Sequence, residues 1–333
     1  MLIKAPYYRI MSQVHKKRIN REKSIYMAEK IIYDIGIIGN GPAGATAAIY
    51  AGRAGLTSIM FEKASPGGQM GITSIIENYP GFPSVGGFEL AMSMNKQAKG
   101  FGASSKTSEV KSVDLLSNPK VITTSRGDFE VKSVIIAGGA KPRLLGVPGE
   151  EEYKGRGVSY CATCDGMFFR GKEVIVNGGG DTAFEDALYL SNICSKVYIV
   201  HRREGFRASA SSVKKAEAHD NIEFILNAVV KEISGDESRV TSVTLKDTVT
   251  GEEKKVECSG IFVAVGRIPE SDLYKDVLNL DPAGYIVAGE DCRTNVDGVF
   301  AAGDIRTKKL RQIVTACADG ANAAEEAGKW LEK

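Results

Sequence analysis

The chain has 333 residues, 43% of them hydrophobic, and a formal net charge of +2. That length suits about two domains with a substantial core, and the near-neutral charge argues against a nucleic-acid-binding protein. No apolar run reaches the roughly 18 residues that a membrane helix needs, and the first residues lack the apolar core of a secretory signal, so we expect a cytoplasmic protein without a membrane partner.

The first 29 residues are rich in lysine and arginine and show no clear apolar period. A basic arm for an acidic partner is one interpretation of such a segment. We favour a loosely ordered basic extension over residues 1–29, or a start assigned too early.

A strand, a glycine turn and a helix are predicted next. The apolar run over residues 31–38 has the length of a buried strand, and residues 45–53 have a helical composition. Between them stands the turn Gly39-Asn40-Gly41-Pro42-Ala43-Gly44. Its first glycine permits a tight turn, its second lets a pyrophosphate approach the backbone, and its third allows close packing of helix on strand. The helix N-terminus offers N–H groups to phosphates, so the pattern predicts a dinucleotide site.

This first unit continues with two more strands. Residues 57–61 form a predicted strand that ends at Glu62, whose carboxylate can accept hydrogen bonds from an adenosine ribose. The predicted strand over 131–137 ends in a glycine pair, and Lys141-Pro142 begins a connection to a new unit. We therefore place a domain boundary near residue 143.

Two cysteines separated by two residues, Cys161 and Cys164, form the reactive motif of the chain. Such a pair can close a small disulfide ring, and one thiol pKa can fall below the free value of about 8.5. Asp165 follows at once and can exchange protons with the attacking or leaving sulfur. Half of a zinc site is the alternative, but no second Cys-x-x-Cys or His-x-x-x-His accompanies the pair, so we expect no metal. The remaining cysteines are interpreted as packed thiols: Cys194, Cys258, Cys292 and Cys317.

The strand, glycine turn and helix then occur a second time. A predicted strand over 173–177 leads into the turn Gly178-Gly179-Gly180-Asp181-Thr182-Ala183 and a helical segment over 184–190. When Gly178 is set on Gly39, the next strand ends at His201 in the place of Glu62.

Arginines follow that equivalent position: Arg202, Arg203 and Arg207. An acidic residue there suits a free 2′-hydroxyl, whereas guanidiniums suit a 2′-phosphate, which they can bind in bidentate fashion. A solvated turn is the alternative. We favour the phosphate site because the spacing after the glycine turn matches in both units.

The end of the chain returns to the first unit. Residues 266–269 are interpreted as the return crossing. A last buried strand within 297–304 is predicted to end at Asp304, which can bond a ribityl hydroxyl or coordinate a phosphate through water. Capping of a helix is the alternative for Asp304, and it is compatible with either role. Residues 311–314 open a final helix over 315–330, whose N-terminal dipole can stabilise negative charge on a flavin.

Two dinucleotide sites with a dithiol between them describe an electron path. A nicotinamide delivers a hydride, a flavin accepts it, and a disulfide takes up the electron pair as two thiols. One site is therefore expected to hold a flavin and the other a nicotinamide.

Several motifs of the chain occur together in one protein family. They are the first glycine turn, Gly67-Gly68-Gln69, Glu77-Asn78-Tyr79-Pro80-Gly81, Cys161-Ala162-Thr163-Cys164-Asp165-Gly166, the second glycine turn, His201-Arg202-Arg203, and Ala301-Ala302-Gly303-Asp304 with Arg311-Gln312. On these motifs, the chain from residue 31 onward resembles the low-molecular-weight, bacterial- or archaeal-type thioredoxin reductases, class II of the pyridine nucleotide-disulfide oxidoreductases. Gly138 is a departure, since the family commonly has threonine there. Enzymes similar to glutathione reductase or lipoamide dehydrogenase carry a Cys-x4-Cys pair around residues 66–83, where this chain has no cysteine.

The resemblance implies an α/β fold of two Rossmann-like dinucleotide-binding domains. An FAD-binding domain is split between residues 30–142 and 268–333, and an NADPH-binding domain over residues 143–267, which carries the Cys-x-x-Cys, is inserted into it. A homodimer built through the FAD domains is the assembly that the family implies.

The resemblance also implies roles for single residues. Cys164 faces the flavin, Cys161 exchanges with thioredoxin or a thioredoxin-like protein, and Asp165 donates and accepts protons. The residues expected to bind FAD are Gly39, Gly41, Pro42, Ala43, Gly44, Glu62, Lys63, Gly68, Gln69, Asn78, Ala137, Gly138, Gly303, Asp304, Arg311, Gln312 and Ile313. Those expected to bind NADPH are Gly178, Gly180, Asp181, Thr182, Arg202, Arg203 and Arg207.

Nicotinamide and disulfide must both reach the flavin, and one arrangement cannot serve both. We therefore hypothesise that the inserted domain swings about linkers near residues 142–146 and 266–269. The alternatives are a flavoprotein that reduces a glutaredoxin-like or peroxiredoxin-linked partner, an NAD(P)H oxidase, and a flavin-binding redox sensor without turnover.

Overall fold

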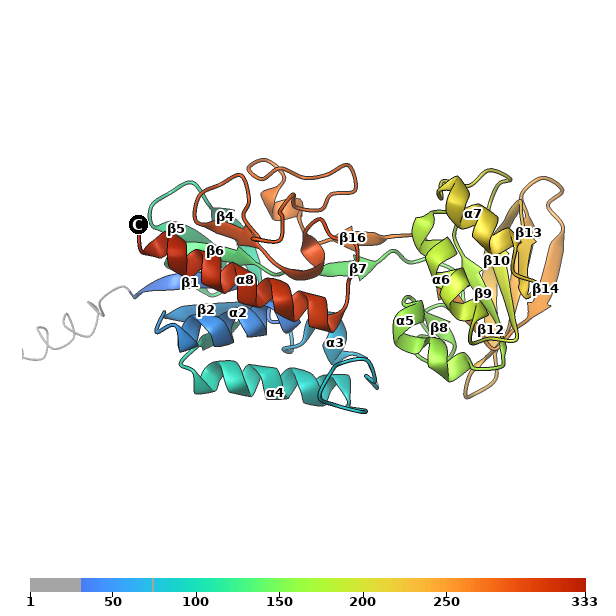
Figure 1. The fold of residues 1–333 in the computed structure, drawn as a ribbon, viewed down its shortest axis with the longest axis horizontal. Helices are drawn as coiled ribbons and strands as arrows, with labels where there is room; N and C mark the ends of the chain where they lie inside the picture. The colour runs from blue at the N-terminus through green and yellow to red at the C-terminus, as the bar shows by residue number, and fades with distance from the viewer. Residues whose placement is uncertain (1–30, 74) are drawn as a thin grey trace, which may run out of the picture.

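Two lobes joined by a narrow ribbon make up the structure, a computed structural model that describes residues 31–73 and 75–333 (Figure 1). The predicted extension over residues 1–29 lies outside the described residues. Among the helices described, none is long and apolar enough to cross a membrane.

The first lobe is built on a seven-stranded sheet. Its strands are β1 (Ile32–Ile38), β2 (Ser58–Glu62), β3 (Ser104–Thr107), β4 (Val110–Asp114), β5 (Lys120–Thr124), β6 (Gly127–Ile136) and β17 (Val299–Ala301). The order β3-β2-β1-β6 is parallel, β17 also pairs with β6, and β5 and β4 extend the sheet in antiparallel fashion. Because parallel strands end at the same edge, the turns after β1, β2, β6 and β17 gather there.

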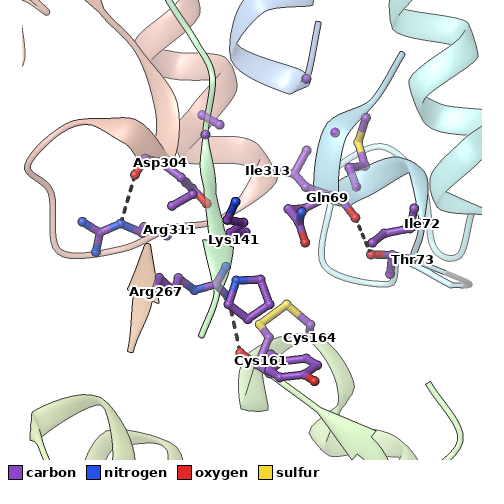
Figure 2. Close-up of a pocket in the computed structure, with 18 of the residues that line it drawn as sticks. Gln69, Ile72, Thr73, Lys141, Cys161, Cys164, Arg267, Asp304, Arg311 and Ile313 are labelled. Carbon is purple, nitrogen blue, oxygen red and sulfur yellow. Dashed lines mark hydrogen bonds between the residues drawn. A yellow bond between two sulfur atoms is a disulfide. The ribbon is translucent and has the colours of Figure 1, made fainter. Parts of the chain in front are cut away.

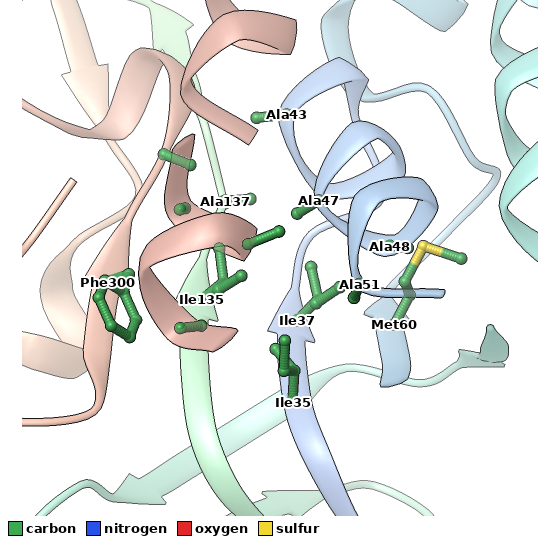
Figure 3. Close-up of a cluster of buried hydrophobic side chains, with 14 of the residues drawn as sticks. Ile35, Ile37, Ala43, Ala47, Ala48, Ala51, Met60, Ile135, Ala137 and Phe300 are labelled. Atoms are coloured by element: carbon green, nitrogen blue, oxygen red, sulfur yellow. The ribbon is translucent and has the colours of Figure 1, made fainter. Parts of the chain in front are cut away.

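Small side chains let two helices cross closely over this sheet. The helices of the lobe are α2 (Pro42–Arg53), α3 (Gly68–Gly71), α4 (Gly87–Gly100) and α8 (Ile313–Leu331). Figure 3 shows alanines of α2 against the isoleucines of β1 and β6, all of them buried. A Cβ added at Gly320 of α8 would lie 2.2 Å from the carbonyl oxygen of Ala43 in α2. Only glycine therefore fits where the two helices cross.

The second lobe has a five-stranded parallel sheet and an antiparallel three-stranded sheet. The parallel sheet has the order β11-β10-β9-β15-β8, from β8 (Val158–Ser159), β9 (Glu173–Asn177), β10 (Lys196–Val200), β11 (Ile222–Ile225) and β15 (Gly260–Val263). The other is formed by β12 (Ala228–Gly235), β13 (Val240–Asp247) and β14 (Glu253–Glu257). Its helical segments are α5 (Ala162–Asp165), η1 (Gly166–Phe169), α6 (Asp181–Ser191) and α7 (Ala210–Glu217).

A two-stranded ribbon carries the chain between the lobes. Strand β7 (Ala140–Pro142) leaves the first lobe, and β16 (Arg267–Pro269) returns to it, paired with β7 in antiparallel fashion (Figure 1). The second lobe is thus inserted between two parts of the first.

The two glycine turns are built alike. In the first lobe Gly39 N donates to Phe61 O at 2.9 Å, and in the second Gly178 N donates to Val200 O at 3.1 Å. The residue after each acceptor therefore occupies an equivalent place, as the alignment of the two turns predicts.

Some element ends differ from the predictions. Helices α2, α6 and α8 begin at Pro42, Asp181 and Ile313. For α2 and α6 this start is about three residues earlier than the apolar pattern indicates. Pro42 fixes a helical φ at the first position directly after Gly41, so no further turn residues are needed. The last strand ends at Ala301 rather than at Asp304, which lies in the 3-10 turn η3 (Gly303–Ile305). The prediction that this strand reaches Asp304 is therefore wrong.

Gly320→Ala is expected to destabilise the protein, because the added methyl group meets the backbone of α2 and forces the helices apart. Overpacking of this kind costs about 1–3 kcal/mol, measurable by urea unfolding followed by circular dichroism. Gly328→Ala on the same helix is the matched control, since its Cβ would meet only Leu56 Cδ1 at 3.6 Å. Alanine there gains up to about 1 kcal/mol of helix propensity. Equal effects of the two substitutions would contradict the close crossing.

Candidate active site

A cavity of about 1230 Å³ opens between the lobes, at the edge where the parallel strands of the first sheet end. It gathers the cysteine pair, Asp165 and nearly all residues predicted to bind FAD. These are Gly39, Gly41, Pro42, Ala43, Glu62, Lys63, Gly68, Gln69, Asn78, Ala137, Gly138, Gly303, Asp304, Arg311, Gln312 and Ile313. Of the predicted FAD residues, Gly44 alone is not on the cavity wall. The residues predicted for NADPH lie away from the cavity, at the second glycine turn: Gly178, Gly180, Asp181, Thr182, Arg202, Arg203 and Arg207.

Cys161 and Cys164 form a disulfide that faces this cavity (Figure 2). From the first lobe, Nε2 of Gln312 lies 3.8 Å from the sulfur of Cys161 and 4.0 Å from that of Cys164. The same Nε2 donates to Thr163 Oγ1 at 3.0 Å, and Asn78 Nδ2 donates to Thr163 O at 3.3 Å. Side chains of the first lobe thus hold the disulfide segment of the second.

Asp165 is a half-buried acid directly after the disulfide. Burial raises the pKa of the Asp165 carboxyl, and the hydrogen bond that Ser159 Oγ donates to its Oδ2 at 2.6 Å opposes the rise. A carboxyl with a raised pKa holds its proton closer to neutral pH, which suits a group that must both donate and accept protons.

The first glycine turn leaves its backbone open to the cavity. Gly39 has a φ of +108°, and a Cβ at Gly44 would lie 2.0 Å from the carbonyl oxygen of Gly39, so both positions require glycine. At Gly41, in contrast, the nearest atom to an added Cβ is 3.9 Å away. A phosphate group can therefore approach the N-terminus of α2 at this point.

Asp304 presents a buried oxygen to the cavity. Its Oδ1 has no hydrogen-bond partner among the described residues, and its side chain lines the cavity. Burial raises the pKa of Asp304, while the charges of Arg267, Lys308 and Arg311 oppose the rise. A buried carboxylate oxygen needs a donor, and a hydroxyl of a flavin's ribityl chain can supply one. Together with the open backbone at Gly41, this oxygen shows that the residues present fit a flavin dinucleotide.

A buried ion cluster, which the sequence patterns did not reveal, holds the turn that carries Asp304. Asp319 of α8 accepts hydrogen bonds from Gly303 N at 2.9 Å, from Arg306 Nε and Nη2 at 2.8 and 2.7 Å, and from Lys308 Nζ at 2.7 Å. The side chains of Arg306 and Asp319 are 3% and 4% exposed. Burial alone would raise the pKa of Asp319, but the hydrogen bonds from Arg306 and Lys308 outweigh it and the pKa is lowered.

The second glycine turn is flanked by free guanidiniums instead of a carboxylate. Arg202, Arg203 and Arg207 are exposed, and their side chains make no hydrogen bond or ion pair to other residues in the described part of the chain. The first lobe has Glu62 at the position equivalent to His201, which these arginines follow, and the Glu62 carboxylate is held by the backbone N–H groups of Asn40 at 3.2 Å and of the next residue at 2.9 Å. The two sites therefore offer opposite charge to the ribose of a bound dinucleotide.

A disulfide that is carried on one dinucleotide-type fold and faces the cavity of another defines an oxidoreductase that couples a dinucleotide to a disulfide. Residues 33–320 match the pyridine nucleotide-disulphide oxidoreductase family. The chain is also 48% identical over 309 residues to the thioredoxin reductase of Bacillus subtilis (strain 168), which covers 92% of this chain and 97% of that protein. It therefore belongs to the pyridine nucleotide-disulphide oxidoreductases and, among them, to the thioredoxin reductases. The predicted family, enzyme class and α/β fold class are confirmed.

Two solved structures have the same fold as this chain but superpose on it with different TM-scores. Thioredoxin reductase from Streptococcus pyogenes MGAS5005 has a TM-score of 0.86 at 44% identity, covering 91% of this chain and 99% of that one. Lactococcus lactis thioredoxin reductase, described as being in the FR conformation, has a TM-score of 0.63 at 45% identity, covering 90% and 99%. Since identity and coverage are nearly equal, the difference in score lies in the arrangement of the chain rather than in its sequence.

Asp319→Asn is expected to cost about 3–5 kcal/mol of stability at neutral pH, because two buried cations lose their anion. The folded pKa of Asp319 lies below its ordinary value of 3.8, so its contribution is present above that value and is lost as the pH falls through the folded pKa. The stability difference from wild type therefore shrinks in acid. Thermal unfolding from pH 7 down to about pH 3 checks this. Asp276→Asn, at an exposed carboxylate, is the control. A stability difference between Asp319→Asn and wild type that does not change with pH would contradict the ion cluster.

Proposed function

We propose that this chain reduces the disulfide of thioredoxin, or of a thioredoxin-like protein, with FAD held in the first lobe and NADPH in the second. The observation that carries the proposal is the Cys161–Cys164 disulfide, which faces the first-lobe cavity beside Gln312. When bound, the two dinucleotides supply hydride transfer and a relay of two electrons to the disulfide.

The first lobe would hold FAD through three features of the cavity edge. The open backbone at Gly41 and the N-terminus of α2 receive the pyrophosphate, Glu62 accepts ribose hydroxyls, and Asp304 accepts a ribityl hydroxyl. The buried bonds of Asp319 fix the turn of Asp304, so its unpaired oxygen is positioned before the cofactor arrives.

The second lobe would hold NADPH at the turn before α6. The N-terminus of that helix begins at Asp181 and offers N–H groups to the pyrophosphate. The exposed guanidiniums of Arg202, Arg203 and Arg207 supply bidentate partners for a 2′-phosphate. NADPH is therefore preferred over NADH in this proposal.

The chemistry of the dithiol follows from its neighbours. In the reduced pair, the Cys161 thiolate attacks one sulfur of the partner's disulfide, forms a mixed disulfide and releases a partner thiolate, which takes up a proton. Cys164, as a thiolate, then attacks the Cys161 sulfur, which re-forms the disulfide and releases the second partner thiolate. Asp165 is the nearby acid whose raised pKa allows it to give and accept these protons.

An exposed apolar patch next to the disulfide supports a protein partner. Met167 and Phe168 follow the reactive motif by a few residues, and they are 46% and 45% exposed. Apolar side chains of this size beside a reactive disulfide favour docking of another protein's surface. A small-molecule substrate would not need them.

We also propose that the second lobe swings about the ribbon during turnover. The disulfide and the second glycine turn lie on the same lobe, so the disulfide must leave the cavity before the nicotinamide site can face it. We take residues 30–142 with 268–333 and residues 143–267 as the two moving domains. The different superpositions on the two solved structures support this. A crosslink between the lobes that left turnover unchanged would reject it.

We further propose a cytoplasmic homodimer formed through the first lobes. Phe88 and Met92 of α4 are 57% and 40% exposed and offer an apolar surface for a second copy. The other four cysteines in the described residues are free thiols, which suits a reducing compartment. Sedimentation velocity tests the assembly, and a monomer at every concentration would reject it.

Anaerobic stopped-flow absorbance is the direct test of the reductase proposal. NADPH is expected to bleach the bound flavin, and one of a panel of oxidised thioredoxin-like proteins is expected to restore its colour. Cys161→Ser should abolish reduction of the partner while flavin bleaching persists, because only the exchanging thiol is lost. If oxygen alone restores the colour in the wild type, an NAD(P)H oxidase is the better assignment.

Arg203→Gln is expected to raise the KM for NADPH about tenfold or more, since a charged hydrogen bond to the 2′-phosphate is lost. The kcat/KM for NADH, which lacks that phosphate, should stay the same. Steady-state kinetics with both nucleotides measure the ratio, and Arg126→Gln on the first lobe serves as the charge-matched control. A parallel loss with both nucleotides would argue against a phosphate site.

A further inference from the structure

Arg267 reaches from the ribbon to the segment that carries the disulfide. The residue lies in β16, where it pairs with Pro142 of β7. Its Nη2 donates to the carbonyl oxygen of Tyr160 at 3.4 Å, and Tyr160 directly precedes Cys161 (Figure 2). None of the predicted cofactor or redox roles includes Arg267.

The ribbon is anchored to the first lobe. Glu270, just after β16, accepts a hydrogen bond from Lys63 Nζ at 3.1 Å and pairs with Lys141 Nζ at 3.2 Å. The backbone N–H of Glu270 also donates to Gly139 O at 3.1 Å. The strand that carries Arg267 is therefore fixed to the end of β2 and to the chain that follows β6.

Tyr160, in contrast, is tied to the second lobe. Its hydroxyl donates to Glu150 Oε1 at 3.0 Å, and Glu150 is only 3% exposed. The same carboxylate accepts the N–H groups of Leu145 at 2.9 Å and Gly146 at 2.7 Å. The chain from residue 145 onward, Glu150 and Tyr160 thus form one unit. The bond from Arg267 to Tyr160 therefore joins the two lobes, whereas the bond from Tyr160 to Glu150 stays within the second lobe.

The charge of Arg267 also lies near acids of both lobes. Burial raises the pKa of Asp186 in α6 to about 7, and the charge of Arg267 opposes that rise. The same charge opposes the rise for Asp304 in the first lobe. A cation within electrostatic reach of an acid on each lobe favours the arrangement that brings both acids near it.

We propose that Arg267 is a latch residue: by holding the carbonyl before Cys161, it favours the arrangement in which the disulfide lies over the first-lobe cavity. This inference rests on the proposed swing of the second lobe. Arg267 acts through position and touches neither sulfur. Its loss shifts the lobes toward the alternative arrangement, in which the nicotinamide site faces the cavity.

The distance between the lobes tests the latch. Nitroxide labels on Lys99→Cys in α4 and Lys254→Cys in β14, both exposed positions, report that distance in the FAD-loaded, oxidised protein carrying Cys317→Ser. Arg267→Gln is expected to lower the ratio of the disulfide-facing population to the alternative about tenfold, the scale of one lost charge-assisted hydrogen bond. Stopped-flow absorbance should show faster flavin bleaching by NADPH and slower recovery through the disulfide. Mere structural damage would slow both.

Two further variants make the test specific. Arg143→Gln removes the same charge from the other linker, where the exposed side chain makes no hydrogen bond or ion pair with a described residue, and should leave distances and rates unchanged. Arg267→Lys keeps the charge and should give an intermediate population. The latch is rejected, and the swing stands, if Arg267→Gln leaves the two populations in the wild-type ratio. The same conclusion follows if Arg143→Gln shifts that ratio as much as Arg267→Gln does. If the wild type shows a single distance between the labels, with and without NADPH, both the latch and the swing are rejected.

Discussion

The chain crosses between the lobes only twice in the described residues, in the paired strands β7 and β16, and this ribbon sets how the lobes are placed. The disulfide belongs to one lobe and the cavity it faces belongs largely to the other, so redox chemistry depends on the geometry across this ribbon. Each of the five buried hydrophobic clusters in the described residues lies within one lobe. The contacts across the cavity are polar, such as those from Gln312 and Asn78 to Thr163. An interface without an apolar core can open at low cost, which suits moving lobes.

The two lobes use the same arrangement of strand, glycine turn and helix for two different candidate dinucleotide sites. Gly39 and Gly178 donate to the neighbouring strand in the same way, so each turn aims a helix N-terminus at the place where a phosphate binds. The residues after that strand then separate the sites, with Glu62 in one and His201, followed by a run of arginines from Arg202, in the other. In the proposed function, the fold fixes where the pyrophosphate lies, and a few exposed side chains select the ribose substituent.

Local patterns in the sequence were sufficient for the strands that flank the two glycine turns, for the turns themselves and for the cysteine pair, because each depends on residues within one turn or strand. They also indicated which residues meet at the cavity, since parallel strands end at one edge. The ion cluster of Asp319, the crossing at Gly320 and the bond from Arg267 to Tyr160 had no such signal. Each joins residues from separate elements whose spacing follows no period, and the bond from Arg267 to Tyr160 alone spans 107 positions. The end of β17 differs from the predicted one because the apolar run continues past the last ladder bond of the strand at Ala301.

The structure holds its fixed and its moving parts with bonds of different kinds. The turn of Asp304 is set by a buried carboxylate that accepts four hydrogen bonds of 2.7 to 2.9 Å, and removing such an ion pair costs several kcal/mol. The disulfide segment is held by separate hydrogen bonds that are exposed or part-buried, such as the one from Arg267 at 3.4 Å, each worth about 1 kcal/mol. Separation of the lobes would therefore cost less energy than disruption of the Asp304 turn. Rigidity at Asp304 and easy release at Tyr160 are both requirements of the proposed swing, which presents two groups in turn to one site.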